Sequence, residues 1–131
     1  MQTLTEEIDV VLGVTPQDIG TADVVGAYVA VGSYTKVLAT LITASLTAAQ
    51  TATIELLQAT SSAGAGAKAL KAAVTATAPT GNGVVTAEVG ASVDELDSNG
   101  GFAYVAVKVT CSENGKVGAS TLALGGKRYS A

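Results

Sequence analysis

Apolar and polar residues alternate with a period of two along much of this chain, which is the pattern of β-strands that are buried on one face. In residues 51–60 the apolar side chains at every second position from Ala52 to Leu56 share one face of an extended chain. In residues 102–111 valines alternate with other side chains in the same way. Residues 35–45 follow this pattern too, so all three segments are predicted to be strands.

Turn-forming residues separate these segments. Gly32-Ser33, Pro79 with "TGNG", and "SENGK" interrupt the alternation. The Asn114-Gly115 pair in the last of these is a strong hairpin signal, and it predicts that residues 102–111 pair with the final apolar run. The full set of expected strands is residues 24–31, 35–45, 51–60, 72–78, 84–89, 102–111 and 117–124.

The Ala-rich segment at residues 67–78 carries mixed signals. Its Ala, Lys and Leu residues favour a helix, whereas Val74, Thr75 and Thr77 favour a strand. We favour a strand at residues 72–78, and a helix is the alternative. Further on, "SVDELDSNGG" predicts a charged loop or a single helical turn.

Short strands between turn signals, with no long helical period, predict an all-β protein that forms a sandwich or a barrel. We expect a single-domain antiparallel β-sandwich at residues 23–131. Residues 1–22 are expected to form an irregular N-terminal arm, because Pro16 and Gly20 interrupt them. Thr5 to Ile8 could begin a short helix in that arm, which Gly13 would limit.

Composition adds a constraint on the surface. Hydrophobic residues make up 48% of the chain, but aromatic residues are only 4% and charged residues only 14%, against about 25% charged in an average protein. The surface must therefore present many Thr, Ser, Ala and Gly side chains. Such a surface suits partial coverage by another protein, although a neutral soluble monomer fits the composition equally well.

Charge and residue content exclude several functions. A net charge of −4 with seven scattered basic residues provides no basic surface for nucleic acid. The chain has no histidine and one cysteine, which excludes His-dependent triads, zinc sites and an internal disulfide. The uncharged run at residues 37–54 is too polar to span a membrane. The N-terminus lacks the pattern of a signal peptide, so we expect synthesis in a cytoplasm.

The remaining reactive groups give no pattern typical of an enzyme. Cys111 ends an apolar strand and is expected to be a buried, inert thiol. Acidic residues gather in two places, and we interpret both as solvated acidic segments without metal-ligand spacing. These acidic residues are Glu6, Glu7, Asp9, Asp94, Glu95 and Asp97. We therefore expect no enzymatic activity and no cofactor.

The C-terminal "LALGGKRYSA" suggests a phosphate-binding loop at first sight. That loop requires a glycine five residues before the Gly-Lys pair and a Ser or Thr after it. Thr121 and Arg128 occupy these two positions, so the motif fails. Gly125-Gly126 is instead expected to turn the chain outward after the last strand.

The order of these features resembles small structural proteins from the head-gene clusters of tailed bacteriophages and prophages. The resemblance covers roughly residues 24–131. It rests on "YVAVGSYTKVLATLITA", "TATIELLQATSSAGAGAKAL", "DELDSNGGFAYVAVKVT" and the closing "LALGGKRYSA", in that order. The family that it indicates is the head decoration, or capsid cement, proteins.

The resemblance implies a jelly-roll-like β-sandwich that binds the outer capsid surface and stabilises the lattice. It implies the major capsid protein and sister subunits as partners, in a homotrimer or a dimer, with neither nucleic acid nor membrane. Localisation would be the exterior of a virion assembled in a bacterial host. The two ends of the chain are the candidate contact segments. Their candidate residues are Thr5, Glu6, Glu7, Ile8, Lys127, Arg128 and Tyr129.

Two other classes fit the same sequence. One is a different virion component, such as a tail-tube, head-completion or fibre-base subunit. The other is a surface-binding or carbohydrate-binding β-sandwich module, which would need several exposed aromatic residues on one face.

Overall fold

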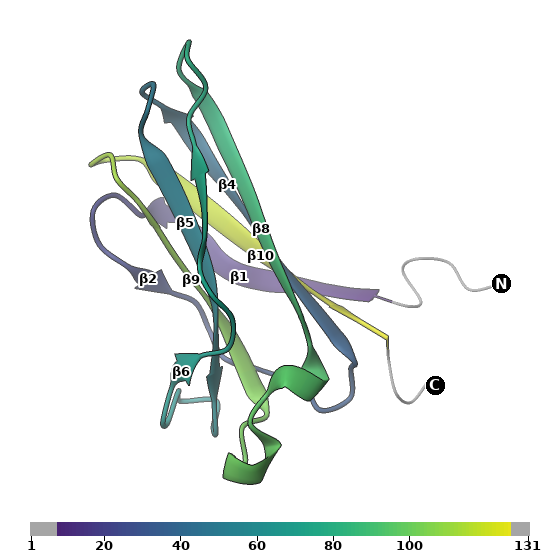
Figure 1. Cartoon of the computed structure of the whole chain (residues 1–131). Coiled ribbons are helices and arrows are strands. Elements are labelled where there is room, and N and C mark those ends of the chain that lie inside the picture. Colours follow the sequence, from purple (N-terminus) through teal and green to yellow (C-terminus); the bar gives the residue numbers. More distant parts are fainter. Residues whose placement is uncertain (1–7, 127–131) are drawn as a thin grey trace, which may run out of the picture.

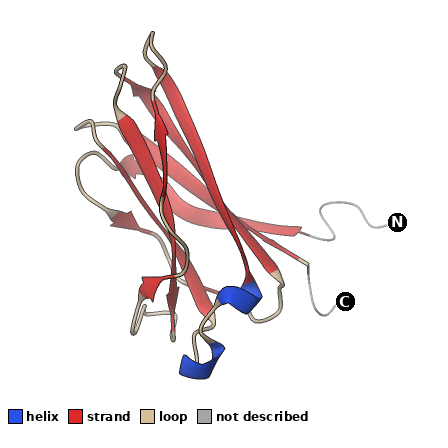
Figure 2. Cartoon of the chain, viewed as in Figure 1, coloured by secondary structure: helices blue, strands red, loops and turns tan. Residues whose placement is uncertain are grey.

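Two antiparallel sheets lie face to face in the computed structural model, which describes residues 8–126 (Figures 1 and 2). The predicted all-β sandwich is confirmed. The strands are β1 (Ile8–Asp18), β2 (Val24–Val25), β3 (Val29–Ala30), β4 (Lys36–Leu46), β5 (Thr51–Ala59), β6 (Lys68–Ala69), β7 (Val74–Thr77), β8 (Gly83–Ser92), β9 (Tyr104–Cys111) and β10 (Val117–Gly125). Two short 3₁₀ turns, η1 (Val93–Glu95) and η2 (Ser98–Gly100), lie between β8 and β9.

The strand order is that of a jelly roll. The first sheet, called sheet A here, has the order β1-β10-β4-β8, and the second, sheet B, has the order β2-β9-β5-β6, with β3 also on β9 and β7 also on β5. Apart from β3, β6 and β7, each strand lies in the opposite sheet from the strand before it. The C-terminal strand β10 is inserted between β1 and β4.

The core fills the space between the sheets with small and branched side chains. Every second residue of β4, β5 and β9 points inward, as their alternation predicts. Val105 and Val107 are fully buried and Val109 is 1% exposed, in the same core as Ala39 and Leu41 of sheet A. The large buried set includes Ile19, Leu46, Ile54, Leu56 and Leu122.

The prediction of an irregular N-terminal arm is wrong for residues 8–18, because β1 pairs with β10 from Ile8↔Gly125 to Asp18↔Val117. Register shifts between Leu12 and Val14 and between Val14 and Gln17 break the period of two. These irregularities made the strand unrecognisable in the sequence. Pro16 is tolerated because β1 is an edge strand.

The predicted hairpin between residues 102–111 and 117–124 is also wrong. Both strands exist, but β9 lies in sheet B and β10 in sheet A. The Asn114-Gly115 turn does reverse the chain, with φ of 75° at Gly115, and it carries the chain from one sheet to the other. The Asn114-Gly115 pair fixes only a local reversal of the chain. The sheet that each flanking strand joins is determined by the packing of its buried face against other strands.

Strand is confirmed within the ambiguous segment, where β7 and the two-residue β6 both pair with β5. The predicted charged loop at residues 92–101 contains η1 and η2. Ser92 caps η1: its hydroxyl accepts a hydrogen bond from the Asp94 amide, and the Glu95 carboxylate accepts one from the Ser92 amide. This is a capping box.

A close approach of two backbones explains why the predicted strand at residues 24–31 is split into β2 and β3. A Cβ on Gly26 would lie 1.6 Å from the carbonyl oxygen of Gly13 in β1. The Gly26 amide donates to the Val107 carbonyl at 2.9 Å. Glycine is therefore required where this edge of sheet B meets the edge of sheet A.

Two hydroxyls buried on the inner face of sheet A differ in their hydrogen bonding. Thr43 Oγ1 accepts from the Val85 amide at 3.1 Å and donates to the Ala44 carbonyl at 2.8 Å. Ser120 is 2% exposed, and its Oγ has no hydrogen-bond partner among the described residues. Burial of an unpaired hydroxyl is destabilising.

We expect Ser120→Ala to leave the free energy of unfolding unchanged or to raise it by up to about 1 kcal/mol, because no hydrogen bond is lost. The matched variant Thr43→Val should lower it by about 1–3 kcal/mol, because the Val85 amide would stay buried without an acceptor. Urea denaturation of both variants measures the difference. A larger loss for Ser120→Ala than for Thr43→Val would contradict this account of the two hydroxyls.

Candidate functional site

The outer face of sheet A is the most unusual surface of the described chain, and we call it the apolar face. The register of the four strands defines it. It is formed by Ile8, Val10 and Leu12 of β1, Ala119, Thr121, Ala123 and Gly125 of β10, Lys36, Leu38, Thr40 and Ile42 of β4, and Val84, Thr86, Glu88, Gly90 and Ser92 of β8.

Large apolar side chains are concentrated on this face. Five of the eight exposed large hydrophobic residues in the described chain belong to it: Val10, Leu12, Leu38, Ile42 and Val84. Val10 is 65% exposed and Ile42 is 55% exposed. Lys36 and Glu88 are the only charged residues of the set. A contiguous exposed apolar surface of this kind marks a site of interaction with another molecule.

The outer face of sheet B has the opposite character. Lys108 of β9 forms an ion pair with Glu55 of β5 at 2.9 Å, and Asp23 lies 3.9 Å from the same ammonium. The hydrogen bond to Glu55 raises the pKa of Lys108. Thr53 and Thr75 share a hydrogen bond between their hydroxyls at 3.0 Å. Polar side chains on this face satisfy one another, so the face is suited to water.

A groove of about 640 Å³ lies at one end of the apolar face. Its lining includes Ile8 of β1, Leu38 of β4 and the small residues Gly90, Ala123 and Gly125. Because Ile8 pairs with Gly125, the two ends of the described chain lie side by side at this groove.

The described residues include only one of the predicted contact residues. Ile8 lies on the apolar face and is half-buried. The other predicted contact residues fall outside the described range, namely Thr5, Glu6, Glu7, Lys127, Arg128 and Tyr129. The predictions for these residues stay untested.

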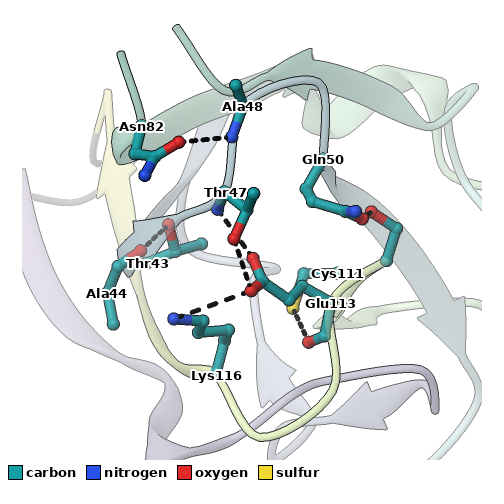
Figure 3. Close-up of polar contacts among 10 residues, drawn as sticks. Thr43, Ala44, Thr47, Ala48, Gln50, Asn82, Cys111, Glu113 and Lys116 are labelled. Carbon is teal, nitrogen blue, oxygen red and sulfur yellow. Dashed lines mark hydrogen bonds and ion pairs between the residues drawn. The ribbon is translucent and has the colours of Figure 1, made fainter. Parts of the chain in front are cut away.

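At the opposite end of the sandwich, four connections lie close together, and we call them the loop end: residues 19–23, 47–50, 79–82 and 112–116. Figure 3 shows residues of the last three. The Ile19 amide donates to the Lys116 carbonyl at 2.9 Å, which joins the first connection to the fourth. The Glu113 carboxylate accepts hydrogen bonds from the Thr47 amide at 2.7 Å and from the Thr47 hydroxyl at 2.8 Å. Lys116 lies 3.8 Å from the same carboxylate.

Further bonds join the other turns of the loop end. The Ala48 amide donates to Asn82 Oδ1 at 2.8 Å, which ties the β4–β5 turn to the β7–β8 turn. Ser112 Oγ accepts from the Thr51 amide and donates to Gln50 Oε1 at 2.6 Å. These bonds hold the turns in one arrangement, as Figure 3 shows for most of them.

The reactive groups noted in the sequence have structural roles here. The Ser92 amide and the Lys71 ammonium donate hydrogen bonds to the Glu95 carboxylate and lower its pKa. The Lys68 ammonium and the Gly100 amide lower the pKa of Asp97 in the same way. Cys111 is 3% exposed, and burial raises the pKa of its thiol, which donates to the Glu113 carbonyl. The predicted buried thiol is thus confirmed.

Within residues 8–126, no group of three or more acidic or cysteine side chains is placed to hold a metal ion. No helix in this range is long and apolar enough to cross a membrane. The described aromatic residues Tyr28, Tyr34, Phe102 and Tyr104 are half-buried. Tyr34 donates a hydrogen bond to Asp9, and the Lys68 ammonium lies over the Phe102 ring.

Comparisons with known proteins identify the fold class but no family. No family model and no curated protein matches the chain. Among solved structures, the SPBc2 prophage-derived protein YomS superposes with a TM-score of 0.51 and 9% identity, over 90% of this chain and 93% of that one. The class is a jelly-roll β-sandwich, and at this identity the likeness is one of fold alone.

Two further matches have lower TM-scores. A chain from infectious bursal disease virus, Gx strain, has a TM-score of 0.49 and 10% identity over 92% of this chain. This chain covers only 32% of the viral one. The carbohydrate-binding module CBM6cm-2 from Cellvibrio mixtus lichenase 5A, solved with cellotriose, has a TM-score of 0.42 and 12% identity over 92% of each chain.

Sequence reasoning missed the apolar face as a unit. The alternation in residues 35–45 already placed Lys36, Leu38, Thr40 and Ile42 together on one side of a strand. Joining that side to β1 and β10 required the register between distant strands, which the local pattern does not contain.

The loop end should loosen in acid, because the Thr47 amide and hydroxyl lower the pKa of Glu113 below its ordinary value of 4.5. A carboxyl whose pKa is lower in the folded state than in the unfolded state stabilises the fold at pH values above its unfolded pKa. This contribution is lost as the pH falls through its folded pKa. Thermal midpoints measured from neutral pH downward should therefore decline below about pH 4.5, and less steeply for Glu113→Gln. Parallel declines for the two proteins would rule out this role of Glu113.

Proposed function

We propose that this chain is a structural protein of a phage particle. It binds the outer surface of the capsid as a decoration, or cement, protein, with the major capsid protein as its partner. It acts through contacts between proteins, without catalysis or a cofactor, on the exterior of the virion.

The contrast between the two outer faces of the sandwich supports a protein that acts by binding other proteins. The face of sheet B pairs its charges, whereas the apolar face exposes Leu38, Ile42 and their neighbours with almost no charge. A jelly roll with one such face is built to be covered by protein.

The likeness to a prophage-derived protein gives further support. YomS matches this chain over nearly the whole of both molecules and is described as derived from the SPBc2 prophage. A compact jelly roll without a long helix suits a subunit that is repeated over a lattice. Many weak contacts of such a subunit add up through multivalency.

The proposal places the loop end against the capsid lattice. Hydrogen bonds from Thr47 to Glu113 and from Ala48 to Asn82 already fix these turns. A surface that is fixed before binding loses little conformational entropy on docking. The opposite end is where the two ends of the described chain lie, at Ile8 and Gly125.

Sedimentation with capsids that lack this protein tests the proposal. The purified chain should co-sediment and saturate at a fixed ratio to the major capsid protein. Thr80→Arg adds a large charged side chain at the loop end and should weaken binding by about tenfold or more. Ser33→Arg, at an exposed turn of the opposite end, is the matched control and should bind normally.

Two results would count against this function. If the chain stays in the supernatant at every concentration, the decoration role is wrong. If Ser33→Arg weakens binding and Thr80→Arg does not, the lattice contacts the other end of the sandwich.

A further inference from the structure

We propose that the apolar face binds the same face of a second copy of this chain, around a two-fold axis. This inference goes beyond the decoration role, since the pair would form in solution without a capsid. The chain would then be the subunit of a symmetric dimer whose two A sheets pack against each other with their loop ends pointing in nearly opposite directions. One subunit of each dimer would then contact the lattice through its loop end.

The charges of the apolar face are complementary to themselves. Lys36 on β4 and Glu88 on β8 are exposed, and neither forms an ion pair with another described residue. Leu38 pairs with Gly90 between them, and Lys36 and Glu88 lie on opposite sides of that pair. The proposed two-fold axis lies midway between the A sheets of the two copies, parallel to both, and passes over the Leu38–Gly90 pair. Rotation about this axis brings Lys36 of each copy opposite Glu88 of the other copy.

This arrangement also matches the apolar side chains. Leu38 lies next to the axis, so it meets the Leu38 of the second copy. Leu38 lies between Gly90 of β8 and Ala123 of β10, and both of these neighbours have little side-chain volume. Two sheets pack about 10 Å apart when such small and branched residues meet. An isologous contact of this kind requires a surface that fits itself.

The area is sufficient for a specific pair. Four strands about 4.8 Å apart, with some nine residues each at about 3.3 Å, give a face of roughly 600 Å². Two such faces bury about 1,200 Å² in total, which is at the lower end of specific protein interfaces. The dimer is therefore expected to be stable but of moderate affinity.

A partner other than a sister subunit would need its own anion and cation at matching positions. The apolar face of a second copy presents Glu88 and Lys36 at these positions after the two-fold rotation. This favours a second copy of the chain as the partner. The occupant of the face is tested by reversing its charges, because only a sister subunit carries the same change.

Sedimentation velocity of the purified chain should show a dimer at about 50 µM, above the micromolar dissociation constants found for weak interfaces of this size class. Glu88→Lys places two lysines opposite each other and should raise the dissociation constant by about tenfold or more. Lys36→Glu should do the same. The double variant Lys36→Glu with Glu88→Lys restores both pairs and should dimerise within about threefold of the wild type.

A second pair of variants controls for folding. Leu38→Lys on the apolar face should abolish the dimer, whereas Val25→Lys on the outer face of sheet B should not. Leu38 and Val25 are 39% and 44% exposed, so the two substitutions are matched. Circular dichroism should show the same β content for both.

A monomer at this concentration, a trimer, or a double charge variant that stays monomeric would each overturn the two-fold contact. A dimer with the predicted rescue supports it whether or not the chain sediments with capsids. Failure of the decoration role and failure of the dimer are thus seen in separate experiments.

Discussion

The insertion of β10 between β1 and β4 is the constraint on which the rest of this structure depends. This strand pairs with β4 from Gly118↔Thr43 to Gly125↔Lys36, and with β1 along its other edge. Because side chains alternate across a strand, the register that buries Leu122 and Leu124 also turns Thr121 and Ala123 outward. One set of backbone hydrogen bonds therefore determines both the core and the apolar face.

The strands that could be predicted from the sequence are those with an undisturbed period of two. β4, β5 and β9 have it, and in β5 and β9 the apolar residues expected to share one face are buried. β1 could not be found, because the irregularities around Val14 and Pro16 break the period. The partner of β9 was assigned wrongly because Asn114-Gly115 specifies only a reversal. Which sheet a strand joins depends on packing between residues far apart in the chain.

The candidate site shows the same division between local and distant information. A charge content of 14% suits a surface that is partly covered by protein, but it fits a neutral monomer equally well. The sequence pointed to the two ends of the chain as contact segments, and of these only Ile8 is within the described structure. The apolar face combines four strands, of which β1 and β8 are separated by about half of the chain. Only the register brings Val10 and Leu38 onto one surface.

The central claim is that protein covers the apolar face, and the reactivity of a cysteine placed on it tests this most directly. Cys111 is 3% exposed, so a thiol introduced by Leu38→Cys would be the reactive one, with Val25→Cys as the control. Both variants are reduced, freed of reductant and kept without oxygen, so that no disulfide forms. Their labelling by maleimide can then be followed as the protein is concentrated. The account predicts that labelling at Leu38→Cys slows steeply with concentration while labelling at Val25→Cys does not change. Equal and constant labelling rates at both positions would contradict it.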